Sequence, residues 1–150
     1  MAARTFSFEV NRTSTAPPST LFKLETDGSL WSQWARPLVP QSRWARRGDP
    51  EPDGVGAVRE LGLWPVLVRE ETLEYEPDRR HVYTFAGMAP VKDYRAEVFF
   101  TPSGDGGTHL RWTGSFTEPL PGTGPALLTA VRGVIRLLSA QLVKAAENRH

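Results

Sequence analysis

The pattern of apolar residues changes its period once along this chain, and that change constrains the fold more than any other feature. From Val39 to Thr117, short apolar runs alternate with turn residues, as in consecutive β-strands. Beyond Pro121 the apolar residues recur every three or four positions, which is the period of an amphipathic helix. A run of strands followed by one long helix predicts an α+β fold in which sheet and helix enclose a space.

The composition fits one compact domain covering residues 1–150. The chain contains 39% hydrophobic and 23% charged residues, which is typical of a globular protein. A chain of this length buries roughly two-thirds of its unfolded surface, enough for a core and a hollow. The net charge of +1 creates no strong field toward nucleic acid or an anionic membrane, so we expect no nucleic-acid partner.

The cellular setting follows from what the sequence lacks. There is no cysteine, which excludes disulfides and thiolate metal sites and favours a reducing compartment. The first ten residues contain no apolar core of a secretory signal. The most apolar short run, Leu63 to Val68, contains a proline and is far shorter than the ~20 residues needed to cross a bilayer. We therefore expect a cytoplasmic protein without membrane insertion.

The punctuation of the chain predicts seven strands and two short helices before the long helix. Alternation over 6–10 indicates a first strand, and the prolines at 17 and 18 open a short helix over about 18–25. A second short helix is expected around 30–34, ending before Pro37. Between the following turns, six strands are expected to begin near Pro40, Val55, Val66, Arg80, Tyr94 and Thr108.

The C-terminal segment predicts a helix of about 25 residues, roughly 35–40 Å long. One side carries an apolar stripe and the other carries charges. The stripe consists of Leu127, Leu128, Val131, Val134, Ile135, Leu138 and Leu142. Laid across the sheet, this stripe would close one side of the fold.

Two hairpins can be phased from their side chains. Pairing Phe100 with Leu110 places the apolar residues of both strands on one face, which we expect to be concave. In the preceding hairpin, pairing Tyr75 with His81 turns Glu71 and His81 inward; a slip of one residue would turn both outward. The same logic places four residues of the third strand inward: Val55, Ala57, Arg59 and Leu61.

Gly114 lies on the expected concave face, between Trp112 and Phe116. Glycine at such a position allows strong curvature of the sheet or close approach by another group. Both are compatible with a sheet wrapped around a helix.

The order of these elements, with several local motifs, resembles the START-like or SRPBCC superfamily, and within it the polyketide cyclase/dehydrase-like branch. The motifs cover nearly the whole chain. They are 54–60 (GVGAVRE), 68–71 (VREE), 75–80 (YEPDRR) with Tyr83, Gly87 with Pro90, 104–108 (GDGGT) with Trp112, and 121–124 (PGTG). The resemblance implies a helix-grip fold with a deep apolar cavity under the C-terminal helix. It implies no common reaction, because the superfamily includes carriers, cyclases, receptors and co-chaperones.

We therefore expect the protein to bind a hydrophobic small molecule, lipid-like or polyketide-like, between the sheet and the helix. The expected partner is this ligand, with no nucleic acid, no membrane insertion and no cofactor, and the protein is expected to be a monomer or weak homodimer. Ten residues are predicted to line the cavity: Arg59, Leu73, Tyr83, Phe85, Tyr94, Val98, Trp112, Phe116, Val134 and Leu138. The aromatic residues among them are equally suited to core packing.

Two alternatives remain open. The protein could be a cyclase or dehydratase in which Glu71 and His81 act as an acid–base pair, although a structural ion pair explains these residues as well. It could also be a protein-interaction module like the co-chaperone members, which would need a large exposed apolar patch.

Other motifs favour structural roles. The glycine-rich segment 103–107 is followed by a strand rather than a helix, so it indicates a hairpin turn and no phosphate loop. Residues 122–124 precede the long helix and are expected to cap it. The arginines between 36 and 47 indicate a solvated strand edge. The spacing of the histidines indicates no metal site.

Overall fold

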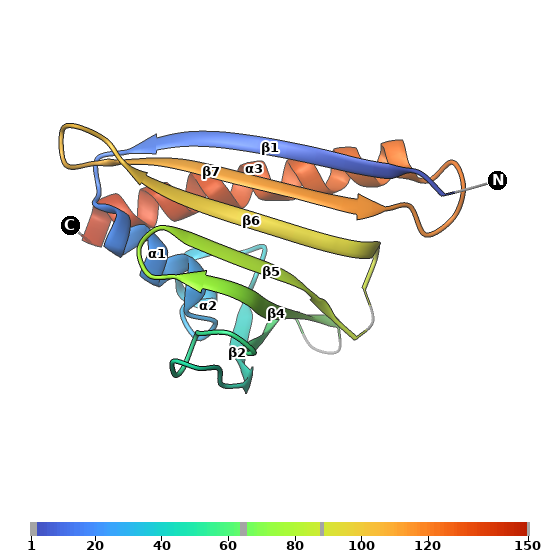
Figure 1. Ribbon diagram of the computed structural model, residues 1–150, viewed down its shortest axis with the longest axis horizontal. Coiled ribbons are helices and arrows are strands. Elements are labelled where there is room, and N and C mark those ends of the chain that lie inside the picture. Colours follow the sequence, from blue (N-terminus) through green and yellow to red (C-terminus); the bar gives the residue numbers. More distant parts are fainter. Residues whose placement is uncertain (1–2, 64–65, 88, 150) are drawn as a thin grey trace.

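The computed structural model describes residues 3–63, 66–87 and 89–149, which form one curved antiparallel sheet and three helices (Figure 1). The strands are β1 (Thr5–Ser14), β2 (Gln41–Arg46), β3 (Val58–Leu63), β4 (Val66–Glu76), β5 (Arg80–Ala86), β6 (Lys92–Pro102) and β7 (Thr108–Thr117). The helices are α1 (Pro18–Thr26), α2 (Trp31–Trp34) and α3 (Gly124–Arg149). Their order along the chain confirms the helix-grip architecture predicted from the sequence.

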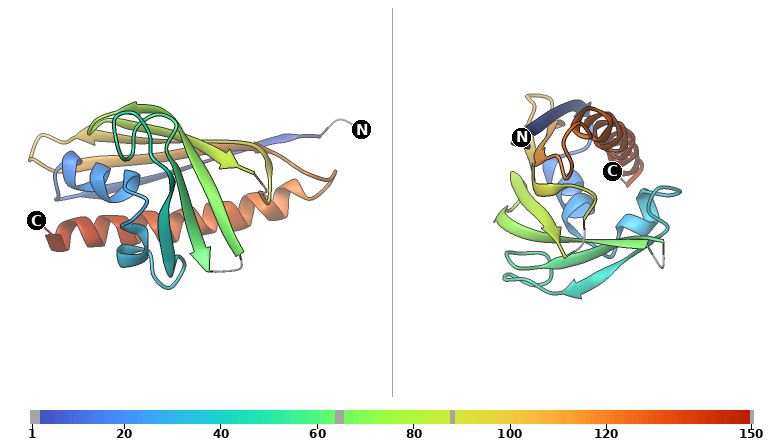
Figure 2. Two further views of the ribbon diagram at one scale, coloured as in Figure 1. Left: turned by 90° about the horizontal axis from the view of Figure 1, so that it is seen from below. Right: turned by 90° about the vertical axis from the view of Figure 1, so that its right-hand side faces the viewer.

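The seven strands follow the order β1-β7-β6-β5-β4-β3-β2. Only the first strand departs from sequence order, because it pairs along the whole length of the last strand. The sheet curls around α1 and α2, and α3 runs along its open side beside β1 (Figure 2). The two sheet edges are therefore β1, flanked by α3, and β2.

Apolar alternation places the core on the concave face. In β1, Phe8 and Val10 are buried whereas Glu9 and Asn11 are exposed. Phe100 lies opposite Leu110, as expected, and both are fully buried. Gly114 provides the close approach that its position suggested, because a Cβ there would lie 2.4 Å from the Phe8 ring. The space beside Gly114 is therefore filled by the ring of Phe8.

The start of α3 is fixed by local chemistry. The carboxylate of Glu118 accepts hydrogen bonds from the backbone N–H groups of Gly124 (3.0 Å) and Arg4 (3.2 Å). The first of these N–H groups lies at the helix N-terminus, where it has no partner within the helix. The helix start is therefore capped by Glu118, which lies before the 122–124 segment that was expected to cap it.

The third strand differs from the prediction at its start. Val55 was expected to face inward, but 49% of its surface is exposed. It forms an isolated bridge with Asp49 inside a compact turn, and β3 begins only at Val58. Ala57, Arg59 and Leu61 are buried as expected. The turn expected between the third and fourth strands lies partly outside the described residues.

Candidate functional site

Four charged or titratable side chains meet on the concave face although each is almost fully buried. Glu25 comes from the last turn of α1, Arg59 from β3, Glu70 from β4 and His81 from β5. Their exposed fractions are 0%, 3%, 9% and 1%. Burying an ionised group costs several kcal/mol of free energy unless the group is paired. Four charged or titratable groups in one buried cluster are therefore a distinctive feature of the interior.

The carboxylate of Glu25 is the centre of the cluster. One oxygen lies 2.8 Å from His81 Nδ1 and the other lies 3.1 Å from an Arg59 terminal nitrogen. Arg59 Nε donates to Glu70 Oε1 at 2.9 Å and a terminal nitrogen donates to the backbone carbonyl of Glu25. His81 Nε2 is 2.9 Å from the Thr72 hydroxyl. The network thereby joins α1 to three neighbouring strands.

The charges shift the pKa values of the two carboxyls in opposite directions. Burial raises the pKa of Glu25, but attraction to His81 and Arg59 outweighs burial and leaves this pKa below its ordinary value. Burial also raises the pKa of Glu70, and here the attraction to Arg59 does not compensate for it. Burial lowers the pKa of Arg59, but attraction to Glu70 and Glu25 raises this pKa by more than burial lowers it. The pKa therefore lies above its ordinary value, and the guanidinium stays charged.

Aromatic rings surround the cluster. The Arg59 guanidinium lies 4.5 Å from the ring centroid of Trp31 and 4.8 Å from that of Tyr83. The Tyr83 hydroxyl accepts a hydrogen bond from Trp112 Nε1 at 3.1 Å. Cation–π contacts of this kind are strongest where water is excluded. In the deep part of the interior these side chains therefore pack directly on one another.

The structure corrects the predicted position of Glu71. Tyr75 does lie opposite His81, as in the favoured register, but a bulge at Leu73 shifts the pairing so that Thr72 lies opposite Tyr83. One extra residue reverses the faces of the residues that precede it in β4. Glu70 and Thr72 therefore point inward, while Glu71 pairs with Arg46 at 3.5 Å in a partly exposed position. The pair Glu71–His81 does not form.

Sequence reasoning missed Glu25, whose carboxylate takes the place foreseen for Glu71. A clue was present in α1, because Glu25 follows Leu21 by four positions and Phe22 by three. These spacings place it on the buried face of the helix, where a carboxylate needs a partner.

The family described as "Polyketide cyclase / dehydrase and lipid transport" matches residues 5–147. The chain belongs to this family. The match agrees with the START-like or SRPBCC resemblance of the sequence motifs. No curated protein matches the sequence.

Three solved structures have the same fold as this family member. A protein from Nitrosospira multiformis has a TM-score of 0.71 at 20% identity, covering 97% of this chain and 100% of its own. XoxI from Bacillus cereus has a TM-score of 0.70 at 19% identity, with coverages of 100% and 99%. Ara h 8.0201 has a TM-score of 0.67 at 18% identity, with coverages of 94% and 99%. At such low identities the likeness shows the fold alone.

The ten residues predicted to line a cavity fall into two groups in this polyketide cyclase/dehydrase-like protein. Seven are buried: Arg59, Tyr83, Tyr94, Val98, Trp112, Phe116 and Leu138. Leu73 and Phe85 are half-buried, and Val134 is 43% exposed. Phe85 stacks on Tyr94 with ring centroids 4.4 Å apart, and so connects the two groups. A ligand role for these residues stays a prediction.

The two halves of α3 differ in how completely they are covered. In the C-terminal half, Leu138, Leu142 and Ala146 are buried, and α1 packs against the helix. In the N-terminal half, Leu128 and Val131 lie on the same side of the helix but are only half-buried. The apolar stripe of α3 is thus incompletely covered where α1 and α2 do not reach it (Figure 1).

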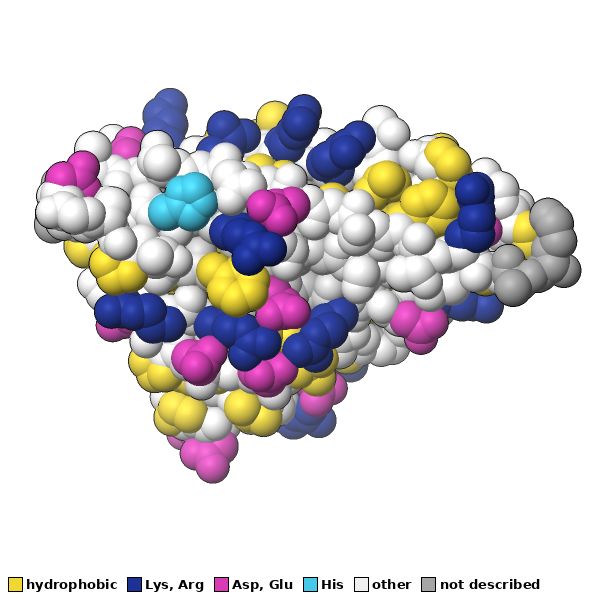
Figure 3. All heavy atoms as spheres, turned by 45° about the horizontal axis from the view of Figure 1, so that its top comes forward, with side chains coloured by type: hydrophobic (Ala, Val, Ile, Leu, Met, Phe, Trp, Pro, Cys, Tyr) yellow, Lys and Arg dark blue, Asp and Glu magenta, His cyan; other side chains and the backbone are white. Residues whose placement is uncertain are grey.

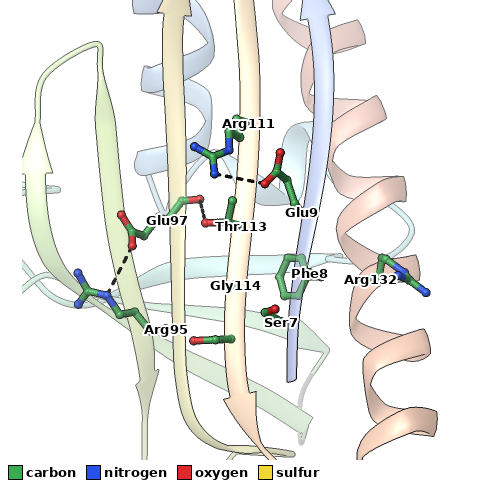
Figure 4. Close-up of a pocket in the computed structure, with 10 residues that line it drawn as sticks. Ser7, Phe8, Glu9, Arg95, Glu97, Arg111, Thr113, Gly114 and Arg132 are labelled. Atoms are coloured by element: carbon green, nitrogen blue, oxygen red, sulfur yellow. Dashed lines mark hydrogen bonds and ion pairs between the residues drawn. The ribbon is translucent and has the colours of Figure 1, made fainter. Parts of the chain in front are cut away.

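The outer face of the sheet has a hollow of about 420 Å³, lined mostly by polar side chains of β1, β6 and β7 (Figure 4). Its charges on the sheet are paired, with Arg111 3.2 Å from Glu9 and Arg95 3.8 Å from Glu97, and Arg132 of α3 lies at its border without an ion pair to a described residue. None of the ten predicted residues lines this hollow. We therefore assign no ligand to it.

Proposed function

We propose that the protein binds an apolar small molecule between the concave face of the sheet and the N-terminal half of α3. The observation that carries the proposal is the half-exposed state of Leu127, Leu128 and Val131, apolar residues whose counterparts one to three turns further along the same helix are buried. Val68 and Phe85 of the sheet are half-buried as well and pack on the edge of the core. A ligand that covered these groups would remove their apolar surface from water.

The size of the effect is sufficient for binding. Burial of apolar surface contributes roughly 25 cal/mol per Å², so several hundred Å² support micromolar affinity after the cost of association. The family description includes lipid transport, which supports an apolar ligand without identifying it. Phe85 and Tyr94 offer ring faces to such a molecule, and the buried charged cluster lies deeper in the interior, where it stabilises the wall.

Binding can be tested with the apolar dye 1-anilinonaphthalene-8-sulfonate and a matched pair of variants. Val131→Asp places a carboxylate on the inward side of α3, whereas Thr129→Asp places the same group on the exposed side. Since a carboxylate in an apolar site must be desolvated, Val131→Asp should lower the affinity by roughly tenfold or more. Thr129→Asp should leave it within about twofold. Equal affinities in both variants would contradict the proposed site.

Acid–base catalysis is the second candidate function, and one observation favours it. Glu25, His81 and Thr72 line up a carboxylate, an imidazole and a hydroxyl in hydrogen-bond contact, which is the order in which a base is oriented and acts. All three are buried, so catalysis would require a substrate to reach Thr72 past the aromatic rings.

The two candidates separate in one experiment. Apolar compounds that co-purify with the protein are identified by native mass spectrometry, extracted and incubated with fresh protein. An enzyme converts its substrate to a product of different mass or retention, and His81→Gln abolishes the conversion. A carrier returns the compound unchanged, and His81→Gln leaves its affinity within a few-fold.

A further inference from the structure

The solvent-facing side of α3 carries two large apolar side chains. The helix contains an 18-residue window with a mean hydropathy of 1.5, of which 22% is buried, and its half-buried Leu127, Leu128, Val131 and Val143 pack against the core. Val134 and Leu137 are 43% and 56% exposed. Between Glu118 and Glu147 the sequence contains no acidic residue. The other exposed residues in the first five turns are small or basic: Pro125, Ala126, Thr129, Ala130, Arg132, Arg136 and Ala140.

Basic side chains without carboxylate partners border this surface. Among the described residues, Arg132, Arg136 and Lys144 of α3 and Arg12 of β1 form no ion pair. Arg12 instead donates to the Ser139 hydroxyl and to the backbone carbonyl of Arg136, both of which are neutral. Figure 3 shows the row of basic side chains along the margin where β1 meets α3.

The outer face of the sheet is organised differently, although it carries as many arginines. Arg80, Arg95 and Arg111 each contact at least one carboxylate. The net charge of +1 therefore conceals an uneven distribution, with paired charges on the sheet and unpaired cations beside α3. The unpaired cations beside α3 therefore attract anions over a distance of about one Debye length.

We propose that α3 docks in the plane of an anionic lipid surface. The helical repeat places Val134 and Leu137 on one flank of the exposed side and Arg132 and Arg136 on the other. In this arrangement the two apolar residues enter the boundary between headgroups and acyl chains, and the guanidinium groups contact lipid phosphates. The ends of β3 and β4, with exposed Leu63 and Val66, lie on the same side of the molecule as α3 (Figure 2).

The helix stays on the sheet in this docked state. Insertion across the bilayer would withdraw Ile135, Leu138 and Leu142 from the core, where they are at most 5% exposed. A second copy of the chain fits the surface less well than a membrane does. A symmetric dimer through α3 would bring the same unpaired cations together, whereas phosphatidylglycerol supplies the opposite charge.

The test is flotation of the full chain with vesicles of phosphatidylcholine alone or mixed with phosphatidylglycerol, at low and high salt. We expect binding only to the anionic vesicles and weaker binding at high salt. Each basic residue near such a surface contributes about 1 kcal/mol, so each charge removed should lower the partition coefficient about fivefold. Arg132→Gln/Arg136→Gln should therefore bind about 25-fold more weakly. Leu137→Ser should also weaken binding while leaving the salt dependence unchanged.

Arg47→Gln/Arg79→Gln is the matched control, because it removes two exposed charges that lie far from α3 in the sequence and form no ion pair with described residues. All variants change exposed side chains and should keep the wild-type melting temperature. Equal binding to neutral and anionic vesicles, or an equal loss in the control variant, would overturn the proposal. So would a dimer in solution that Leu137→Ser dissociates. The dye-binding measurement is independent of these results.

Discussion

At the scale of single residues, the buried network shows why partners matter more than positions. Glu25 is fully buried and is the only carboxylate in contact with both His81 and Arg59 among the described residues. If it were neutralised, His81 would lose its carboxylate partner and Arg59 would keep only Glu70. Breaking one member of a buried ion pair typically costs 3–5 kcal/mol for this reason.

We predict that Glu25→Gln lowers the free energy of unfolding by about 3 kcal/mol or more at neutral pH. Urea denaturation followed by tryptophan fluorescence measures this change. Glu51→Gln, at an exposed position, should shift the free energy by less than about 0.5 kcal/mol. A loss of under about 1 kcal/mol in Glu25→Gln would mean that the network contributes little to stability.

The pH dependence of stability should distinguish the two buried carboxyls. Because the folded-state pKa of Glu25 lies below its ordinary 4.5, its contribution is complete above about 4.5 and is lost as the pH falls further. Glu70 has the opposite sign, because its pKa is raised by burial and protonation favours the folded state. The difference in free energy of unfolding between the wild type and Glu25→Gln should therefore become smaller as the pH falls. On the same acidification, the free energy of unfolding of the wild type should rise relative to that of Glu70→Gln. Parallel pH profiles for the two variants would refute this assignment.

The residue scale is also where sequence reasoning failed. The pairing of Tyr75 with His81 was predictable from alternation, but the bulge at Leu73 was not. A bulge depends on how neighbouring strands and α1 pack, and a single sequence does not contain that information. The prediction was therefore wrong by one residue: it placed Glu71 in the interior, where the structure has Glu70.

At the scale of elements, almost every boundary was predictable because turns and caps depend on local chemistry. Helix α1 begins at Pro18, α2 begins at Trp31, and α3 begins at Gly124, the last residue of the PGTG segment. What could not be predicted was which element fills a given space. The close approach at Gly114 is made by Phe8 from β1, which is distant in sequence and adjacent only in the sheet.

Two glycines offer a prediction with opposite signs for the same substitution. Gly114→Ala should destabilise the protein by about 1–3 kcal/mol, because the new methyl group would overlap the Phe8 ring. Gly133→Ala, within α3 and with no atom nearby, should stabilise it by about 0.5–1 kcal/mol through helix propensity. Thermal unfolding measures both. Adding Phe8→Leu to Gly114→Ala should recover part of the loss, and no recovery would locate the strain elsewhere.

At the scale of the whole molecule, α3 connects the two proposals while serving each with a different side. Its inward side is well covered over the C-terminal half and poorly covered over the N-terminal half. Its outward side is apolar and bordered by unpaired cations. The fold class was predictable from the order of strands and helix, but this unequal coverage depends on how far α1 and α2 extend under the sheet.

The unequal coverage predicts unequal hydrogen exchange along α3. Backbone amides of residues 127–134 should exchange faster than those of 138–146, because local opening of the first segment exposes less additional apolar surface. Addition of 1-anilinonaphthalene-8-sulfonate should slow exchange in 127–134 and in β5 near Phe85, and should leave 138–146 unchanged. The same dye added to Val131→Asp should give no such protection. Protection confined to 138–146 would place the ligand at the C-terminal half of α3. That result would contradict a binding site at the N-terminal half.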